Sequence, residues 1–198
     1  RDGVDTSIVI VDTESATGVA IITLSDDAEN TIVVSPGANG RLGVGDVEAA
    51  REVLSRATVT LLQLEVPLAA VEAAVSAARG LVVLNPAPAR LLPFELLERV
   101  DVLVPNRSEL ALLTDSTEAT TTEEAAEQAM NLRGPKNVVV TLGSEGALLI
   151  QNGEVTRIAA PLVKPVDTTA AGDAFCGALA DALARGESVA DAVRWAVH

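Results

Sequence analysis

The chain has 198 residues, of which 48% are hydrophobic, and it carries a formal net charge of −14. This length and apolar content predict one globular domain rather than a disordered chain. The acidic balance and the scarcity of aromatic residues, with no Tyr, two Phe and one Trp, argue against nucleic acid and against an acidic membrane surface as partners. No stretch has the length and hydrophobicity of a transmembrane helix.

The single cysteine and the single histidine restrict the chemistry further. Cys176 has no partner for an intramolecular disulfide, which fits a reducing cytoplasm, and its helical surroundings favour a buried structural thiol. Because His198 is the only histidine, a Ser-His-Asp triad or a histidine-rich metal site is hard to build. The chain starts without Met and stops inside a helical pattern, so we expect a fragment of a longer protein.

The first quarter of the chain predicts a small β-structure followed by a helix. A short strand is expected at 7–11, and the β-rich runs 18–24 and 31–34 flank a polar loop, which predicts a hairpin. An ordinary hairpin at a sheet edge is one interpretation of these runs. Asp46 is a candidate cap for a helix over 47–56.

The rest of the chain alternates buried strands with helices. The predicted strands are 58–64, 81–84, 101–104 and 137–142, and the predicted helices are 67–79, 93–99, 106–113 and one beginning at Thr122. Asn152-Gly153 predicts a further hairpin between 146–151 and 154–159. This alternation predicts an α/β fold with a mostly parallel sheet covered by helices on both faces. Ligands bind such sheets at the carboxyl ends of the strands, where we expect Glu65, Asn85, Asn106 and Gly143.

A stretch near the C-terminal end carries the strongest chemical signal. A strand-like approach at 157–166 leads into Asp167-Thr168-Thr169-Ala170-Ala171-Gly172-Asp173, and a helical pattern follows. The first helical turn has unpaired N–H groups and the positive end of the dipole, so it can hold an anion beside Asp173. Transfer of a phosphoryl group to a hydroxyl needs such a base and such donors. An ordinary helix start with an acidic first turn fits the composition as well.

The run Asp-Thr-Thr-Ala-Ala-Gly-Asp-Ala-Phe at 167–175 closely resembles the C-terminal signature of the ribokinase (phosphofructokinase-B type) sugar kinases. The resemblance covers nearly the whole chain. It implies a three-layer α/β/α, Rossmann-like fold with a small β-lid at about 7–36, and a partial kinase domain that lacks the family's N-terminal and C-terminal parts. It also implies that Asp173 is the catalytic base, and that the backbone of Ala170, Ala171 and Gly172 forms an anion hole.

Two further motifs have both a family interpretation and a structural one. Glu65, in Gln-Leu-Glu before Pro, resembles a sugar-binding carboxylate, although a surface charge at a strand end fits the residue too. Asn106 and Glu109 match an Asn-x-x-Glu pattern, which implies contacts with the nucleotide phosphates and, through water, with Mg²⁺. The same spacing fits a helix cap with a capping-box Glu.

The run Thr141-Leu142-Gly143-Ser144-Glu145-Gly146 resembles the family's nucleotide loop, in which two glycines allow phosphates to approach the backbone. Asp167 and Thr169 fall where ribokinases provide oxygen ligands for a monovalent cation, K⁺. The resemblance implies an ATP-dependent kinase that uses Mg²⁺ and K⁺ on a pentose. Ribose is favoured by the unbroken match at 85–90, and a homodimer through the β-lid is expected. The alternative is a catalytically silent domain that binds a nucleotide or sugar, or assembles through its lid.

Overall fold

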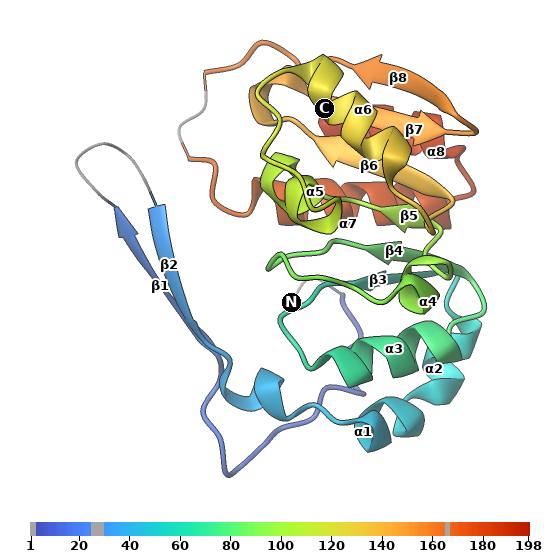
Figure 1. Cartoon of the computed structure of the whole chain (residues 1–198). Coiled ribbons are helices and arrows are strands. Elements are labelled where there is room, and N and C mark those ends of the chain that lie inside the picture. The colour runs from blue at the N-terminus through green and yellow to red at the C-terminus, as the bar shows by residue number, and fades with distance from the viewer. Residues whose placement is uncertain (1–2, 25–29, 165–166) are drawn as a thin grey trace.

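The protein is described by a computed structural model over residues 3–24, 30–164 and 167–198. Within these residues, the main body contains a six-stranded sheet in which the strands follow chain order from β3 to β8. A separate hairpin of β1 and β2 projects away from this body (Figure 1). None of the described helices is long and apolar enough to cross a membrane.

The sheet is parallel in its first part and antiparallel in its last part. Its strands are β3 (Val59–Leu62), β4 (Leu81–Leu84), β5 (Val102–Leu103), β6 (Asn137–Thr141), β7 (Ala147–Gln151) and β8 (Glu154–Ile158). The pairs from β3 to β6 are parallel, whereas β7 is antiparallel to β6 and to β8. Asn152 and Gly153 join β7 to β8 with φ angles of 53° and 78°. Positive φ at both residues is typical of the type I′ turn that their sequence predicts.

Helices cover both faces of the sheet (Figure 1). One face carries α3 (Leu68–Ala77), α4 (Phe94–Leu97), α5 (Arg107–Leu113) and α6 (Thr122–Asn131), and the other carries α7 (Ala171–Ala184) and α8 (Val189–Val197). The alternation of side chains along each strand explains these layers. In β4, Val83 packs with α7 and α8, whereas Val82 and Leu84 pack with α3 and α4. The predicted three-layer α/β/α fold is confirmed.

The remaining helices lie outside the α3 layer. They are the short turn η1 (Gly37–Arg41), α1 (Val44–Ala49) and α2 (Arg51–Arg56). Val47 of α1 is buried against Ala70 and Ala74 of α3. Burial of an apolar side chain of this size contributes roughly 1.5–3 kcal/mol, so this contact fixes α1 on the helical layer.

The predicted N-terminal hairpin is confirmed. β1 (Val19–Leu24) and β2 (Asn30–Ser35) are antiparallel, with Val19 opposite Ser35 and Leu24 opposite Asn30. Residues 25–29 of the predicted loop lie outside the described part of the chain. Val19, Ile21 and Val33 are exposed, and their register places them on one face of the hairpin.

Three local predictions are wrong. Residues 7–11 are irregular and largely exposed, because no strand of the described chain pairs with them. Asp46 does not begin a helix: α1 begins at Val44, and the Asp46 carboxylate accepts a hydrogen bond from the Gly43 N–H at 2.8 Å. The strand expected to run to 166 ends at Ile158; residues 159–164 are irregular, and 165–166 lie outside the description.

Candidate active site

The carboxyl ends of the parallel strands present the predicted polar residues along one edge of the sheet. Glu65, Asn85 and Asn106 follow β3, β4 and β5. Asn106 forms a β-bridge with Thr141, and the Thr141 N–H donates to the Pro105 carbonyl oxygen at 2.9 Å. The start of α5 therefore lies directly beside the end of β6, where the predicted nucleotide loop begins.

A cavity of about 470 Å³ brings together two motifs that are far apart in the sequence. Thr141, Gly143, Ser144 and Gly146 line it from the connection between β6 and β7, and Thr168, Ala171 and Gly172 line it from the approach to α7. Other walls are largely apolar and include Leu162, Val163, Phe175 and Val197. Its volume lies in the range of small-molecule and cofactor sites, roughly 300–1,000 Å³.

The loop at the end of β6 depends on its two glycines. Gly143 and Gly146 have φ angles of 58° and 94°. A Cβ atom on Gly146 would lie 2.0 Å from the carbonyl oxygen of Ile158, so only glycine fits there without a backbone shift. Leu142, also predicted to bind ATP, is buried in the core, and its N–H donates to the Gly146 carbonyl oxygen at 2.8 Å.

The first turn of α7 has the geometry of an anion cradle. Ala170 precedes the helix in the left-handed conformation, with φ 58° and ψ 17°, and its carbonyl oxygen accepts from the Ala174 N–H at 2.9 Å. The N–H groups of Gly172 and Asp173 have no hydrogen-bond acceptor within the helix, because the carbonyl groups four residues earlier lie before its start. Gly172 lines the cavity, and Asp173 is exposed one residue later. Asp173 and Gly172 therefore lie together at the start of α7, whereas the N–H of Ala171, also predicted to form the anion hole, donates to the Thr168 carbonyl oxygen at 3.2 Å.

A buried thiol, Cys176, lies on α7 one turn after Asp173. Cys176 is buried, and burial, followed by the negative charges of Asp173 and Glu109, raises the pKa of its thiol to about 12. The thiol is neutral at physiological pH, which agrees with the predicted structural role. Asp173 belongs to α7 and Glu109 to α5, so charges from two elements add to the effect of burial on this thiol.

Asn106 and Glu109 form the capping box that their spacing predicts. The Glu109 N–H donates to Asn106 Oδ1 at 2.8 Å, and the Asn106 N–H donates to Glu109 Oε2 at 2.8 Å. Burial raises the pKa of Glu109, although the hydrogen bond from Asn106 opposes that shift. The structural interpretation of the motif is therefore realised, and Glu109 is held as a buried carboxylate at the sheet edge.

Glu65 lies in a second cavity, of about 550 Å³, which it shares with Val34 and Pro36 at the base of the hairpin and with Pro88. Glu65 therefore does not line the cavity beside the predicted nucleotide loop, and it lies at the base of the predicted β-lid instead.

Asp167, close to the start of α7, accepts a hydrogen bond from the Thr169 N–H at 2.8 Å, which lowers the pKa of the Asp167 carboxyl group. Among the described residues, no group of three or more His, Cys, Asp or Glu side chains gathers as a metal cluster.

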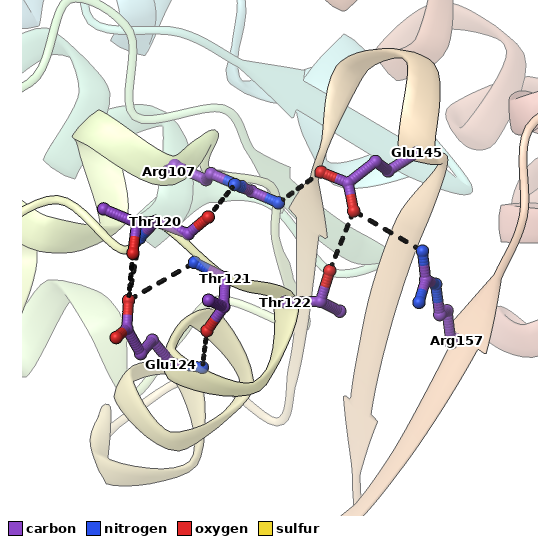
Figure 2. A network of polar contacts seen from close by, with 7 residues as sticks. All are labelled: Arg107, Thr120, Thr121, Thr122, Glu124, Glu145 and Arg157. Carbon is purple, nitrogen blue, oxygen red and sulfur yellow. Dashed lines mark hydrogen bonds and ion pairs between the residues drawn. The ribbon is translucent and has the colours of Figure 1, made fainter.

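Glu145 stands apart from the other residues of its loop. It does not line the cavity; its carboxylate binds Arg107, Thr122 and Arg157 instead (Figure 2). We did not identify these three partners from the sequence. They lie 38, 23 and 12 residues from Glu145, and no local motif connects them.

Comparisons with known proteins agree with this geometry. The family described as pfkB family carbohydrate kinase matches residues 1–198. The chain is 38% identical to a ribokinase of Schizosaccharomyces pombe and 39% identical to a ribokinase of Staphylococcus aureus, covering 99% and 96% of this chain. The solved structure of Arabidopsis thaliana ribokinase complexed with ribose and ATP is similar with a TM-score of 0.77 and 32% identity, over 92% of this chain and 61% of that one.

The chain spans 64% of the length of each of these two curated relatives.

Proposed function

Because the chain belongs to the pfkB family of carbohydrate kinases, we propose that its protein transfers a phosphoryl group from ATP to the primary hydroxyl of ribose. The observation that carries this proposal is the single cavity in which the nucleotide loop meets the first turn of α7. The ribokinases among its relatives, and a neighbour complexed with ribose and ATP, support the choice of sugar and nucleotide.

Asp173 is the proposed general base. Its carboxylate takes the proton of the sugar hydroxyl, whose oxygen then attacks the γ-phosphorus as the bond to the β–γ bridging oxygen breaks and ADP leaves. The N–H groups of Gly172 and Asp173, at the start of α7, stabilise the charge on the transferring group. The exposure of Asp173 beside the cavity-lining Gly172 supports this role.

Three residues fit the two cations that the family resemblance implies. One oxygen of the buried Glu109 carboxylate accepts the Asn106 N–H; the other accepts none of the hydrogen bonds found within the described residues, so it suits a water of hydrated Mg²⁺. Bound Mg²⁺ would neutralise charge on the phosphates. Asp167 and Thr169 provide hard oxygen ligands suited to K⁺, and the lowered pKa of Asp167 keeps its carboxylate ionised.

The hairpin and Glu65 form the proposed sugar-binding part of the site. Glu65 lines the cavity under the hairpin, which supports a role as acceptor of hydrogen bonds from ribose hydroxyls.

The exposed apolar face of Val19, Ile21 and Val33 supports pairing of the hairpin with a second copy of the chain. The free, buried thiol of Cys176 supports a reducing cytoplasm as the protein's location.

A panel of acceptors tests the proposal in an ADP-release assay on the full-length protein. Ribose, deoxyribose, fructose 6-phosphate and a nucleoside are compared at equal concentrations. We expect the highest kcat/KM with ribose, and preference for the nucleoside or fructose 6-phosphate would contradict the substrate. Calorimetric binding of ATP and Mg²⁺ without turnover of any acceptor would support the alternative, a catalytically silent binding domain.

A further inference from the structure

The Glu145 carboxylate connects the nucleotide loop to three other elements (Figure 2). Its Oε1 accepts a hydrogen bond from Arg107 Nη2 of α5 at 2.7 Å. Its Oε2 accepts from Thr122 Oγ1 of α6 at 3.0 Å and forms an ion pair with Arg157 Nη2 of β8 at 3.4 Å. One side chain therefore joins the loop to residues contributed by two helices and a strand.

The partners on the helical side are themselves held in place. The Arg107 side chain is only 19% exposed, and its Nη1 donates to the Thr120 carbonyl oxygen at 3.3 Å. Glu124 accepts the N–H groups of Thr120 and Thr121 at 2.8 and 3.3 Å, and its own N–H donates to Thr121 Oγ1 at 3.1 Å. This capping network fixes the start of α6, so the anchor for Glu145 is organised in advance (Figure 2).

The two ends of the loop, Leu142 and Gly146, are buried, whereas residues 143–145 between them are exposed. Glu145 belongs to η2 (Gly143–Glu145), a short turn that contains no buried residue, so packing of its side chains does not fix its conformation. The backbone bonds that close the turn are those from Leu142 to Gly146, from Glu145 to Leu142 and from Gly146 to Gly143. Gly143, Ser144 and Gly146 line the cavity, whereas Glu145 does not. The loop thus lines the cavity without its one charged side chain, because Glu145 binds neighbouring elements instead.

We propose that Glu145 is a positioning residue that holds the backbone of residues 143–146 in the conformation that receives the nucleotide phosphates. This inference rests on the proposed function, because it assigns a role within the ATP site. A loop that samples other conformations binds its ligand more weakly in proportion to the fraction of competent molecules. Loss of the Glu145 carboxylate should therefore weaken ATP binding. It should leave the chemical step largely intact, because the carboxylate is not among the groups that line the cavity.

The experiment compares Glu145→Ala and Glu145→Gln with the wild type in the full-length protein. The control is Glu154→Ala, which removes an exposed carboxylate from the far end of the same β7–β8 hairpin. If the competent fraction falls to about a tenth, KM for ATP rises about tenfold. We expect that rise in Glu145→Ala, a smaller one in Glu145→Gln, less than about a threefold change in kcat, and no change in KM for the sugar.

Hydrogen exchange of the unliganded protein provides a measurement that does not depend on turnover. Amides of residues 143–146 should exchange faster in Glu145→Ala than in the wild type or in Glu154→Ala, because local opening of the loop becomes easier. Arg107→Gln should add little to Glu145→Gln, since residues that act as one pair are not additive. If Glu145→Ala does not fold, Glu145→Gln, which keeps the shape and the acceptor oxygen for Thr122, carries the same measurements.

The outcomes separate this inference from the proposed function. Unchanged loop exchange, or an unchanged KM for ATP, in both Glu145 variants overturns the positioning role. A fall in kcat accompanied by rises of similar size in KM for ATP and in KM for the sugar, together with a lower Tm, also overturns it, because these changes indicate a general structural role. Absence of sugar phosphorylation by the wild type overturns the proposed function instead, and loop exchange still shows whether the carboxylate holds the turn.

Discussion

The two glycines of the nucleotide loop should respond very differently to the same substitution. Both have positive φ, 58° at Gly143 and 94° at Gly146, and both line the cavity. Their surroundings differ. A Cβ atom on Gly143 would meet nothing within 4 Å, whereas one on Gly146 would lie 2.0 Å from the Ile158 carbonyl oxygen and 2.6 Å from the Ala160 nitrogen.

The expected losses follow from these distances. In Gly143→Ala, the left-handed conformation costs roughly 1–2 kcal/mol, and the lower entropy of the unfolded chain offsets roughly 0.4–1 kcal/mol of that, which leaves about 1 kcal/mol. In Gly146→Ala, backbone strain of roughly 1–3 kcal/mol combines with a backbone shift costing roughly 1–3 kcal/mol, so about 4 kcal/mol is expected. Domains of this kind have roughly 5–15 kcal/mol of stability in total, so Gly146→Ala should stay folded with roughly 1–11 kcal/mol remaining.

Urea unfolding followed by circular dichroism measures both losses of free energy, and thermal unfolding measures the corresponding shifts in Tm. A loss of 1 kcal/mol lowers Tm by roughly 2–4 °C at this chain length, so Tm should fall by about 3 °C in Gly143→Ala and by about 12 °C in Gly146→Ala. Gly153→Ala, at φ 78° with nothing within 4 Å of its Cβ, is the control and should behave like Gly143→Ala. The reasoning is refuted if Gly146→Ala loses no more stability than the other two variants.

Asp173→Asn in the full-length protein should lower kcat roughly 10²–10⁴-fold with little change in KM for ATP. Asp181→Asn, which removes an exposed ion pair with Arg185 further along α7, should be nearly silent, and near-normal kcat in Asp173→Asn would rule out the base. Burial raises the pKa of Glu109 above its ordinary 4.5, so the folded protein binds that proton more tightly than the unfolded chain does. Relative to Glu109→Gln, the wild type should therefore lose stability as pH rises through the folded pKa and show no loss below about pH 4.5. Urea unfolding at about pH 4 and about pH 8 checks the sign, and a wild type that gains stability relative to Glu109→Gln at the higher pH would contradict it. If Asp167 and Thr169 bind K⁺, activity should be higher in K⁺ than in Na⁺ at equal ionic strength, and equal rates would count against that site.

Features that depend on neighbours along the chain were predicted correctly. Asn106 caps α5, Thr122 begins α6, and Asn152-Gly153 forms the turn between β7 and β8. Each signal acts over two to four residues, so the sequence contains both partners. The apolar runs of β4 and β6 likewise predicted strands, and their alternate residues pack against two helical layers. The run at 58–64 was expected to be covered on both faces, but Leu61 of β3 is 41% exposed.

Features that depend on a distant partner were predicted poorly. The run at 7–11 has β-forming residues, but a strand exists only when another strand satisfies its hydrogen bonds, and none of the described strands lies beside it. Asp46 is a local exception. Its residue type favours a helix cap, yet α1 begins at Val44, and the Asp46 carboxylate accepts the Gly43 N–H from within the first turn.

The sequence by itself determined the layers of the fold, the caps and the motifs of the candidate site, since these follow from periodicity and from short-range chemistry. Only the tertiary structure joined the loop at 141–146 to the turn at 168–172 around one cavity. It also decided the direction of Glu145, which the family resemblance implied to be a nucleotide contact. That side chain binds Arg107, Thr122 and Arg157 because the fold brings two helices and a strand to the back of the loop.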